Sequence, residues 1–300
     1  MSRADLELRA GRRRVRITHP DKVLFPGDGI TKAGLAGYYA EVAPAMVPHM
    51  RGRPINLWRW NAGIDGPRIV QQEIPKGAPD WVRRVTVPKR EGGEVCHAVG
   101  GDAATLLWLA NQNCITPHVW TSRADRPERP DRLVFDLDPP DLEGFGTVRE
   151  AALALGDLLR ELRLEPFALV TGSKGVHVVA PLRRTASAES VRAAAGEIGE
   201  ELAARMPDTL TTAWRKEKRN GRVLVDTARN TYAQTVVAPY AVRAFPGAPV
   251  ATPLAWEELA DRELHPRRWT LRTLPQRLEE RDDPWADISR HAGPPPRPHG

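Results

Sequence analysis

Two aspartates, Asp136 and Asp138, end an apolar run in the segment Leu133-Val-Phe-Asp-Leu-Asp-Pro-Pro140. Side chains two residues apart on a β-strand point to the same face of the sheet, so these carboxylates are expected to lie close together. A divalent cation between them relieves their repulsion, and hard oxygen ligands suit Mn²⁺ or Mg²⁺. The pair therefore favours two-metal phosphoryl transfer, although a strand end with solvated acids is the simpler interpretation of two aspartates alone.

Two further segments offer groups for the same chemistry. Asp226 ends another apolar strand and is a candidate third metal ligand. In the segment 171–177, two glycines flank Ser173 and Lys174 in a predicted tight turn, which offers a hydroxyl, an ammonium and backbone N–H groups to a phosphate. His177 on the returning strand can donate to a triphosphate oxygen. An ordinary hairpin turn is the alternative, and the segment is not a P-loop because no helix follows it.

The elements that must position these groups follow from hydrophobic periodicity and turn residues. Strands are predicted at 15–18, 54–59, 68–73, 133–138, 166–171, 176–181 and 222–226. Helices are predicted at 31–50, 101–113, 148–164 and 187–206. Hairpins and helices mix without regular β-α-β alternation, which predicts an α+β fold.

Composition limits the possible functions. The chain has 300 residues, 41% of them hydrophobic, which suffices for one large domain or two joined lobes. The net charge of +6 modestly favours a polyanionic partner. Cys96 and Cys114 are the only cysteines, so a disulfide framework and a cysteine-built zinc site are excluded. We expect a cytoplasmic protein, because the sequence shows neither an apolar membrane span nor a signal peptide.

The composition also changes at both ends of the chain. Residues 1–14 are polar and rich in arginine and predict a mobile basic arm, and the proline-rich residues 281–300 predict a disordered tail. Between them we expect one catalytic domain, residues 15–280. Its N-terminal lobe is expected at about 15–125 and its metal-binding core at about 126–280.

Taken together, these segments resemble the polymerase domain of bacterial LigD proteins, a branch of the archaeo-eukaryotic primase superfamily. The resemblance spans roughly residues 15–280 in the order of the family, which makes it more specific than any single motif. The segments that match are Asp21-Lys-Val-Leu-Phe-Pro26, Thr31-Lys32, Tyr38-Tyr39, Gly52-Arg-Pro54, Phe135-Asp-Leu-Asp-Pro139, Thr171-Gly-Ser-Lys-Gly-Val-His177, Val223-Leu-Val-Asp226, Arg229-Asn230 and Ala238-Pro-Tyr-Ala-Val-Arg243.

The resemblance implies a primase-like catalytic core of central antiparallel sheets flanked by helices. It implies template-directed nucleotide addition at DNA ends or at gapped duplexes with a 5′-phosphate. Two Mn²⁺ or Mg²⁺ ions would be the cofactors, NTP or dNTP the substrate, and ribonucleotides preferred. The setting would be non-homologous end joining at the nucleoid, with Ku and an ATP-dependent DNA ligase as partners.

The resemblance also implies roles for individual residues. The metal ligands would be Asp136, Asp138 and Asp226, the last also near the primer 3′-hydroxyl. The expected nucleotide contacts are His118, Ser173, Lys174, His177, Arg219 and Arg243. The expected contacts to a downstream 5′-phosphate are Lys22 and Lys32, and those to the template or other DNA are Arg53 and Arg59.

Several positions depart from the family pattern. Ile69 and Val70 stand where aromatic residues often stack on a base or nucleotide. Trp58 replaces a basic residue, and Gln72 and Gln234 stand where lysine is common. These changes affect the handling of template and nucleotide more than metal binding. No segment resembles a ligase or a phosphoesterase, so we expect either a stand-alone polymerase, which the chain ends favour, or an excised domain.

Two other functions stay open on the sequence. A metal-dependent nuclease can use the same carboxylates with water as the nucleophile, but it has no need of a triphosphate-binding turn. A non-catalytic module that binds or bridges DNA ends could keep the fold, although the three aspartates argue against it.

Overall fold

The computed structural model describes residues 5–298, and these form two compact units. The first unit holds the described residues up to Trp120, together with Val237–Ala251 and Trp269–Asp283. The second unit holds Thr121–Val236, Thr252–Arg268 and the described residues from Pro284 onward. The expectation of two lobes, each continuous in sequence, is therefore wrong, because C-terminal segments return to the first unit.

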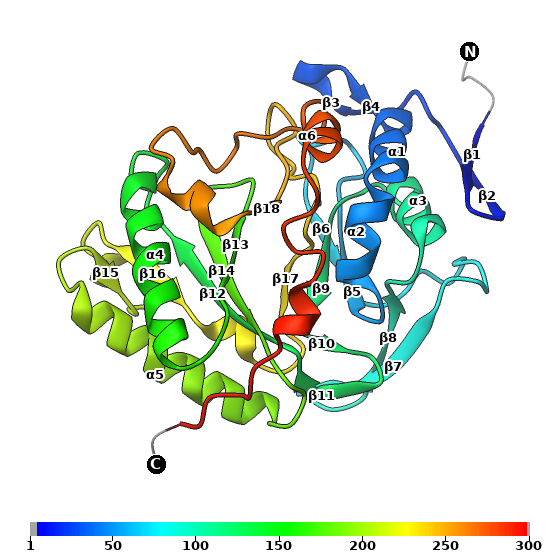
Figure 1. Cartoon of the computed structure of the whole chain (residues 1–300). Helices are drawn as coiled ribbons and strands as arrows, with labels where there is room; N and C mark the ends of the chain where they lie inside the picture. The colour runs from blue at the N-terminus through cyan, green and yellow to red at the C-terminus, as the bar shows by residue number, and fades with distance from the viewer. Residues whose placement is uncertain (1–4, 299–300) are drawn as a thin grey trace. The chain divides into compact units, whose positions relative to one another are not determined.

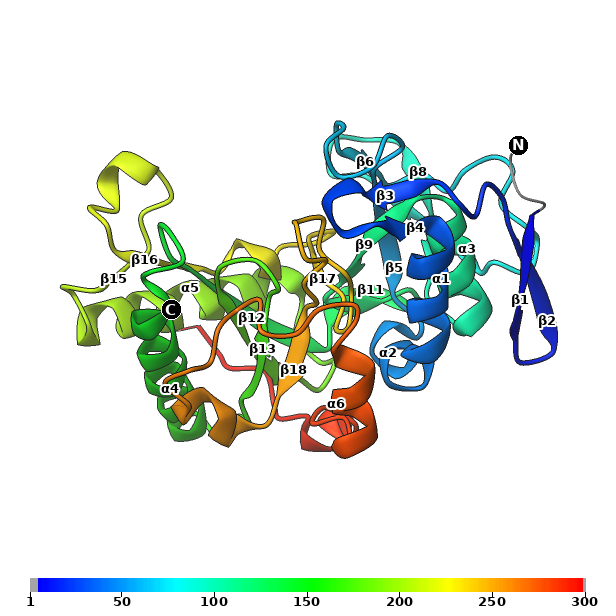
Figure 2. The same cartoon turned by 90° about the horizontal axis from the view of Figure 1, so that it is seen from above.

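The first unit is built on an antiparallel sheet with helices packed beside it (Figure 1). The central strand β5 (Pro54–Arg59) pairs with β9 (Cys114–Trp120), β8 (Glu94–Val99) and β6 (Ile69–Gln71), and β7 (Arg84–Pro88) pairs with β8. Its helices are α1 (Lys32–Glu41), α2 (Ala43–Met50), α3 (Ala103–Asn111) and α6 (Leu274–Glu280). Helices α1 and α3 lie side by side (Figures 1 and 2).

The helix predicted at 31–50 is two helices, which meet at Val42. Thr31 caps the first one, since its side chain accepts a hydrogen bond from the Gly34 backbone N–H. Pro44 lies in the first turn of α2 and has no N–H to donate to the preceding turn. The proline therefore ends α1 and begins a new helix.

The predicted mobile arm at 1–14 is wrong for the part that the structure describes. Strands β1 (Leu6–Ala10) and β2 (Arg13–Ile17) form an antiparallel hairpin that packs on α3. The hairpin is held because Val15 and Ile17 are buried. Residues 1–4 lie outside the described residues. A second small sheet pairs β3 (Val23–Phe25) with β4 (Ile30–Thr31), and the 3₁₀ turn Pro26–Asp28 joins them.

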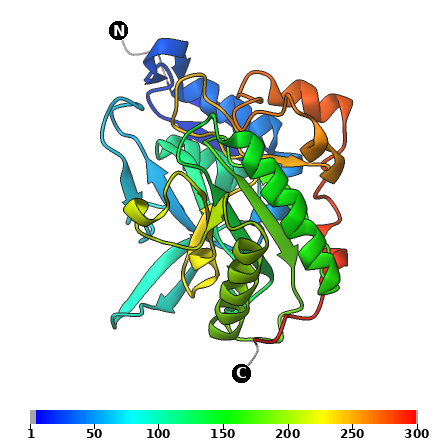
Figure 3. The same ribbon diagram turned by 90° about the vertical axis from the view of Figure 1, so that its left-hand side faces the viewer.

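The second unit is built on a six-stranded sheet in the order β15-β16-β12-β14-β13-β18. Neighbouring strands are antiparallel except for β15 and β16. Helices α4 (Phe145–Glu161) and α5 (Ala188–Arg205) pack against this sheet (Figure 3). The strands are β12 (Arg132–Asp138), β13 (Phe167–Val170), β14 (Val176–Pro181), β15 (Leu210–Thr211), β16 (Val223–Asp226) and β18 (Thr252–Leu254). The predicted antiparallel α+β core is confirmed.

Shorter elements complete the second unit. Strands β10 (Ser122–Arg123) and β11 (Arg126–Pro130) form a hairpin. Strand β17 (Thr235–Val237), where the chain passes back to the first unit, belongs to the sheet of that unit. The 3₁₀ helices are Lys216–Lys218, Ala228–Asn230, Trp256–Ala260 and Ile288–His291. No helix among residues 5–298 has the length and apolar character that crossing a membrane requires.

The predicted disordered tail is also wrong as far as Pro298. Trp285 is 2% exposed, and its indole N–H donates to the carbonyl of Ala168 at 3.1 Å. The guanidinium of Arg132 lies over the same ring. This buried tryptophan holds the proline-rich segment against β13, an effect that local composition does not reveal. Residues 299 and 300 lie outside the described residues.

A buried asparagine completes the hydrogen bonding of β12 where β16 ends. The side chain of Asn230 accepts from the N–H of Val134 at 2.8 Å and donates to the carbonyl of Val134 at 2.7 Å. Asn230 is 1% exposed, so no solvent could replace these bonds. The amide therefore substitutes for a strand neighbour beside the candidate site.

Replacing this amide should destabilise the second unit. Asn230→Ala leaves the N–H and carbonyl of Val134 buried and unpaired, and we expect the free energy of unfolding to fall by about 3 kcal/mol. Chemical denaturation followed by circular dichroism measures this. Gln234→Ala, at a nearby exposed position, is the control and should change stability by less than about 0.5 kcal/mol. Equal stability of both variants would contradict the role given to Asn230.

Candidate active site

The register of the second-unit sheet brings four polar residues together. Asp136 on β12 is directly opposite Asp226 on β16 and directly opposite His177 on β14. Residues directly opposite each other in antiparallel strands point to the same face, and so does Asp138, two residues along β12. The three predicted carboxylates and the predicted histidine therefore share one face of the sheet.

Helix α5 covers the other face of this sheet. A Cβ atom built on Gly199 of α5 would lie 3.4 Å from the side chain of Val225. Val225 adjoins Asp226 along β16, so the two side chains point to opposite faces. The carboxylates consequently point away from α5, which leaves their face open to other groups.

Basic side chains surround these carboxylates. The Nε atom of Arg229 lies 3.6 Å from a carboxylate oxygen of Asp136 and 3.5 Å from one of Asp226. His177 Nε2 lies 3.5 Å from the other oxygen of Asp136. Because Arg229 bridges two carboxylates that face each other, its positive charge offsets their repulsion.

Asp138 has its own basic neighbours. The ammonium of Lys174 lies 3.4 Å from one carboxylate oxygen, and the Nη1 atom of Arg219 lies 3.9 Å from the other. These are long ion pairs on partly exposed side chains, so they add little to stability. Both cations offset the negative charge of Asp138.

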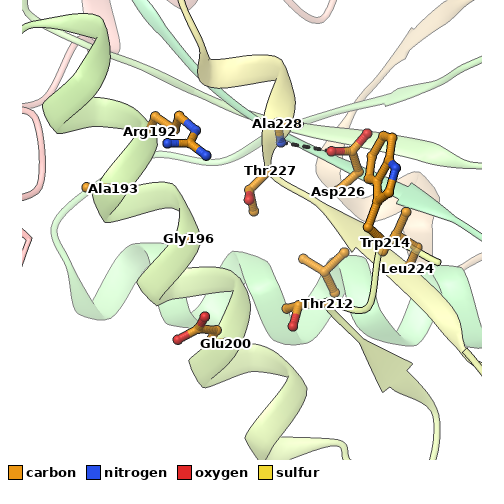
Figure 4. A pocket seen from close by; sticks show the side chains of 11 residues that line it. Arg192, Ala193, Gly196, Glu200, Thr212, Trp214, Leu224, Asp226, Thr227 and Ala228 are labelled. Atoms are coloured by element: carbon orange, nitrogen blue, oxygen red, sulfur yellow. Dashed lines mark hydrogen bonds between the residues drawn. The ribbon is translucent and has the colours of Figure 1, made fainter. Parts of the chain in front are cut away.

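Asp226 is the most deeply buried of the three carboxylates. It is 5% exposed, and one oxygen accepts the backbone N–H of Ala228 at 2.8 Å (Figure 4). Burial raises the pKa of this carboxyl, and the charge of Asp136 raises it further, while the Ala228 N–H and Arg229 oppose the rise. A carboxylate with a raised pKa is a better proton acceptor than an ordinary surface aspartate.

The turn predicted between 171 and 176 is present and tightly built. Gly172 has φ +64°, a conformation that favours glycine. A Cβ on Gly175 would lie 2.0 Å from the carbonyl oxygen of Leu137, so only glycine allows this close approach to β12. Lys174 Nζ donates to the carbonyl of Pro139 at 2.9 Å, which directs the ammonium toward the end of β12. The carbonyl of Ser173, in turn, accepts from Arg267 Nε at 3.0 Å.

The carboxylates of the site are suitable ligands for a divalent ion, but their side chains are not arranged as a preformed metal site. Within residues 5–298, no three or more histidine, cysteine, aspartate or glutamate side chains form a group that could hold a metal ion. Asp136, Asp138 and Asp226 offer carboxylate oxygens, which are the ligands that Mn²⁺ and Mg²⁺ prefer. Any ion bound there would compete with Arg229 for the same oxygens. The predicted metal site therefore stays a prediction.

A cavity of about 340 Å³ adjoins Asp226 (Figure 4). One wall is α5, which contributes Arg192 and Glu200. Asp226 and Trp214 are among the other residues that line the cavity (Figure 4). The lining is mostly polar, as expected of a site for a charged ligand rather than for an apolar one.

The remaining predicted residues belong to the first unit. His118 is 5% exposed on β9, and its ring stacks on Trp58 with centroids 3.7 Å apart. The guanidinium of Arg68 lies 4.2 Å from the centroid of the Trp58 ring, so this tryptophan has a cationic and an aromatic neighbour. The side chain of Arg243 lies over the ring of Phe245.

Burial of Arg53 does not favour the predicted contact to DNA, which stays a prediction. Arg53 is 2% exposed, and its guanidinium donates to the carbonyls of His49 and Trp120 at 3.1 Å each. These hydrogen bonds connect the start of β5 to the end of α2 and to the end of β9, which is a structural role. Arg59 is partly buried and donates to the carbonyl of Gln112 at 2.7 Å, and its contact to DNA stays a prediction.

Lys22, Lys32 and Arg59 concentrate positive charge in the first unit. Lys32 is 4% exposed, and its ammonium donates to the carbonyl of Asn111 at 3.1 Å. Burial, together with the charges of Lys22 and Arg59, lowers the pKa of Lys32 to about 8. A buried ammonium beside two cations is stabilised by an anion, which is consistent with the expected phosphate site.

Comparison with known proteins identifies the family of the chain. Residues 31–285 match the family described as the LigD primase-polymerase domain. The multifunctional non-homologous end joining DNA repair protein LigD of Mycobacterium tuberculosis is 36% identical over 260 residues, which cover 84% of this chain. The corresponding Pseudomonas aeruginosa protein is 34% identical over 283 residues, or 94% of this chain.

The chain belongs to the LigD primase-polymerase domain family. A solved structure, the polymerase domain of M. tuberculosis ligase D in complex with DNA, is similar with a TM-score of 0.87 and 33% identity, covering 93% of this chain and 99% of that one. The fold is therefore that of a LigD polymerase domain. The chain spans only about a third of the length of both LigD relatives, 34% in each case.

Sequence reasoning about this LigD-type domain missed three residues of the site. Arg229 follows Asp226 by three residues, and its place in a matching segment was the available signal. Arg267 contacts the turn at Ser173 from a segment distant in the sequence, so no local sequence pattern could predict this contact. Trp214 precedes the basic run 215–219, is exposed, and lines the same cavity as Asp226.

The tight turn offers a direct test of the site's construction. Gly175→Ala places a methyl group against the backbone of Leu137, and we expect the free energy of unfolding to fall by roughly 3 kcal/mol. Gly146→Ala in α4 is the control, because a Cβ there meets nothing within 4 Å. Thermal denaturation of both variants should show a loss only for Gly175→Ala. Wild-type stability of that variant would mean that the turn does not press against β12 as described.

Proposed function

We propose that this chain is a template-directed nucleotidyltransferase that fills gaps and extends DNA ends during non-homologous end joining. The proposal rests on one observation above others. Three carboxylates lie on one face of the sheet with basic groups at their edge, in a domain of the LigD primase-polymerase family. The DNA bound to the related M. tuberculosis domain supports a DNA substrate.

The residues of the second unit divide the work of the reaction. Asp136, Asp138 and Asp226 would hold the divalent ions, Mn²⁺ or Mg²⁺, which when bound neutralise charge on the phosphoryl group and activate the attacking hydroxyl. Asp226 would also lie near the primer 3′-hydroxyl. Lys174 and Arg219 would bind the phosphates of the incoming nucleotide.

Further contacts to the nucleotide rest on the family resemblance alone. They are the hydroxyl of Ser173, the ring of His177, and His118 and Arg243 of the first unit. Use of NTP or dNTP, association with Ku and an ATP-dependent ligase, and action at the nucleoid belong to the same proposal. The name of the LigD relatives, which refers to end joining in DNA repair, supports these proposals for this chain.

A gap-filling assay tests the proposed activity. Purified protein, a gapped duplex with a 5′-phosphate, Mn²⁺ and labelled NTP or dNTP should yield an extended primer. Asp136→Ala should lower the rate at least about a thousandfold while DNA affinity changes little, because the carboxylate acts on the reacting groups. Glu143→Ala, an exposed acid on the following loop, is the control and should extend primers normally.

The assay also separates the competing functions. A nuclease would shorten the labelled strand, and a bridging module would bind ends without changing their length. Extension by Asp136→Ala at the rate of the wild-type protein would contradict the assignment of the active site.

The lowered pKa of Lys32 predicts how recognition of a 5′-phosphate depends on pH. Below about pH 8 the ammonium is charged and attracts the phosphate, and above it the group loses its proton and the attraction weakens. The preference for 5′-phosphorylated over 5′-hydroxyl ends should therefore fall as the pH rises from about 7 to about 9.5.

Fluorescence anisotropy with the two kinds of end measures this preference. Lys32→Met should show a weak preference that no longer changes around pH 8, while Lys76→Ala, an exposed lysine elsewhere, should behave as wild type. A preference in the wild-type protein that is constant across this range would contradict the role of Lys32.

A further inference from the structure

Trp214 presents an unusual aromatic surface in the second unit. It is 66% exposed and is the most exposed large hydrophobic residue in the described part of the chain. Its indole takes part in no hydrogen bond or ring stacking with any residue among 5–298. Because most of this apolar ring is in contact with water, a ligand that covers it would be stabilised.

The loop around Trp214 is strongly basic. Residues 213–222 contain five basic side chains and one acidic side chain, Glu217. This positive charge would not favour the binding of an apolar protein surface or an acyl chain. An exposed aromatic ring within a basic loop is the combination that binds single-stranded nucleic acid, in which bases stack and phosphates pair with the cations.

Arg219 connects Trp214 to the carboxylate site. The guanidinium of Arg219 donates to the carbonyl of Trp214 at 2.9 Å and to that of Ala213 at 3.2 Å. Its Nη1 atom lies 3.9 Å from Asp138. The backbone that presents the indole is therefore tied to the residue that flanks a catalytic carboxylate.

The indole and Asp226 line the same cavity, whose volume is about 340 Å³ and whose lining side chains are drawn in Figure 4. The proposed function assigns Asp226 to the primer 3′-hydroxyl. A base stacked on Trp214 would thus belong to the nucleotide that carries this hydroxyl, or to its neighbour.

We propose that the Trp214 indole stacks on a base at the 3′ end of the primer strand and positions that end for reaction. The cations of the loop, among them Arg215 and Lys216, would hold the phosphates that follow. Trp214 is then a positioning residue and takes no part in proton or phosphoryl transfer. The assignment of the stacked base to the primer strand rests on the proposed function.

The experiment uses the full chain and primers with 2-aminopurine as the 3′-terminal base. The fluorescence of this base is quenched when it stacks on an aromatic ring, and the measurement needs neither nucleotide nor metal. We expect quenching with wild-type protein, its loss in Trp214→Ala, and its retention in Trp214→Phe. Leu162→Ala is the control, because Leu162 is an exposed apolar residue at the end of α4, 40% exposed.

Primer extension gives a second readout. Trp214→Ala should raise the KM for the primer about tenfold, the loss expected for one base–aromatic stack, and change kcat less than about twofold. Trp214→Phe should restore most of the affinity. A fall in kcat without a change in KM, or no change in either, would overturn the positioning role.

The outcomes separate this inference from the proposed function. Quenching that depends on Trp214 in a protein that extends no primer would support the stack and contradict the polymerase activity. Extension by the wild-type protein with equal quenching in Trp214→Ala would overturn the stack and leave the activity standing. Quenching of 2-aminopurine in the template strand but not at the primer end would overturn the assignment to the primer.

Discussion

Repulsion between facing carboxylates is the constraint on which the rest of the site depends. Asp136 and Asp226 are directly opposite each other on adjacent strands, and Asp138 points to the same face. Such a group is stable only if cations compensate its charge. The chain supplies them from separate segments: Arg229 after β16, Lys174 from the glycine turn and Arg219 from the basic loop.

Close approach of the backbone makes this arrangement possible. Gly175 lets the turn with Lys174 pack directly against β12, where a Cβ atom would meet the carbonyl of Leu137. Asn230 satisfies the backbone groups of Val134 that β16 no longer pairs, so β16 can end at Asp226 and leave its carboxylate at the strand end. Packing at Gly175 and hydrogen bonding by Asn230 thus determine the positions of the Lys174 ammonium and the Asp226 carboxylate.

The strands that carry the three carboxylates could be predicted from the sequence because apolar runs end in acids at Asp138 and Asp226, and the glycine turn has a local signature. Other features depend on tertiary contacts that no local pattern records. Arg53 looks like any surface arginine, yet carbonyl partners bury it. The proline-rich tail looks disordered, yet Trp285 holds it in place. Arg229 reaches Asp136 because the register of the strands places that residue directly opposite Asp226.

Anomalous diffraction at the manganese edge tests the central claim most directly. In crystals of the chain soaked with Mn²⁺ and a nucleoside triphosphate, we predict manganese peaks bound by the carboxylates of Asp136, Asp138 and Asp226, with the Arg229 guanidinium displaced from between Asp136 and Asp226. Manganese bound elsewhere, with Arg229 still bridging these two carboxylates in the presence of nucleotide, would contradict the account.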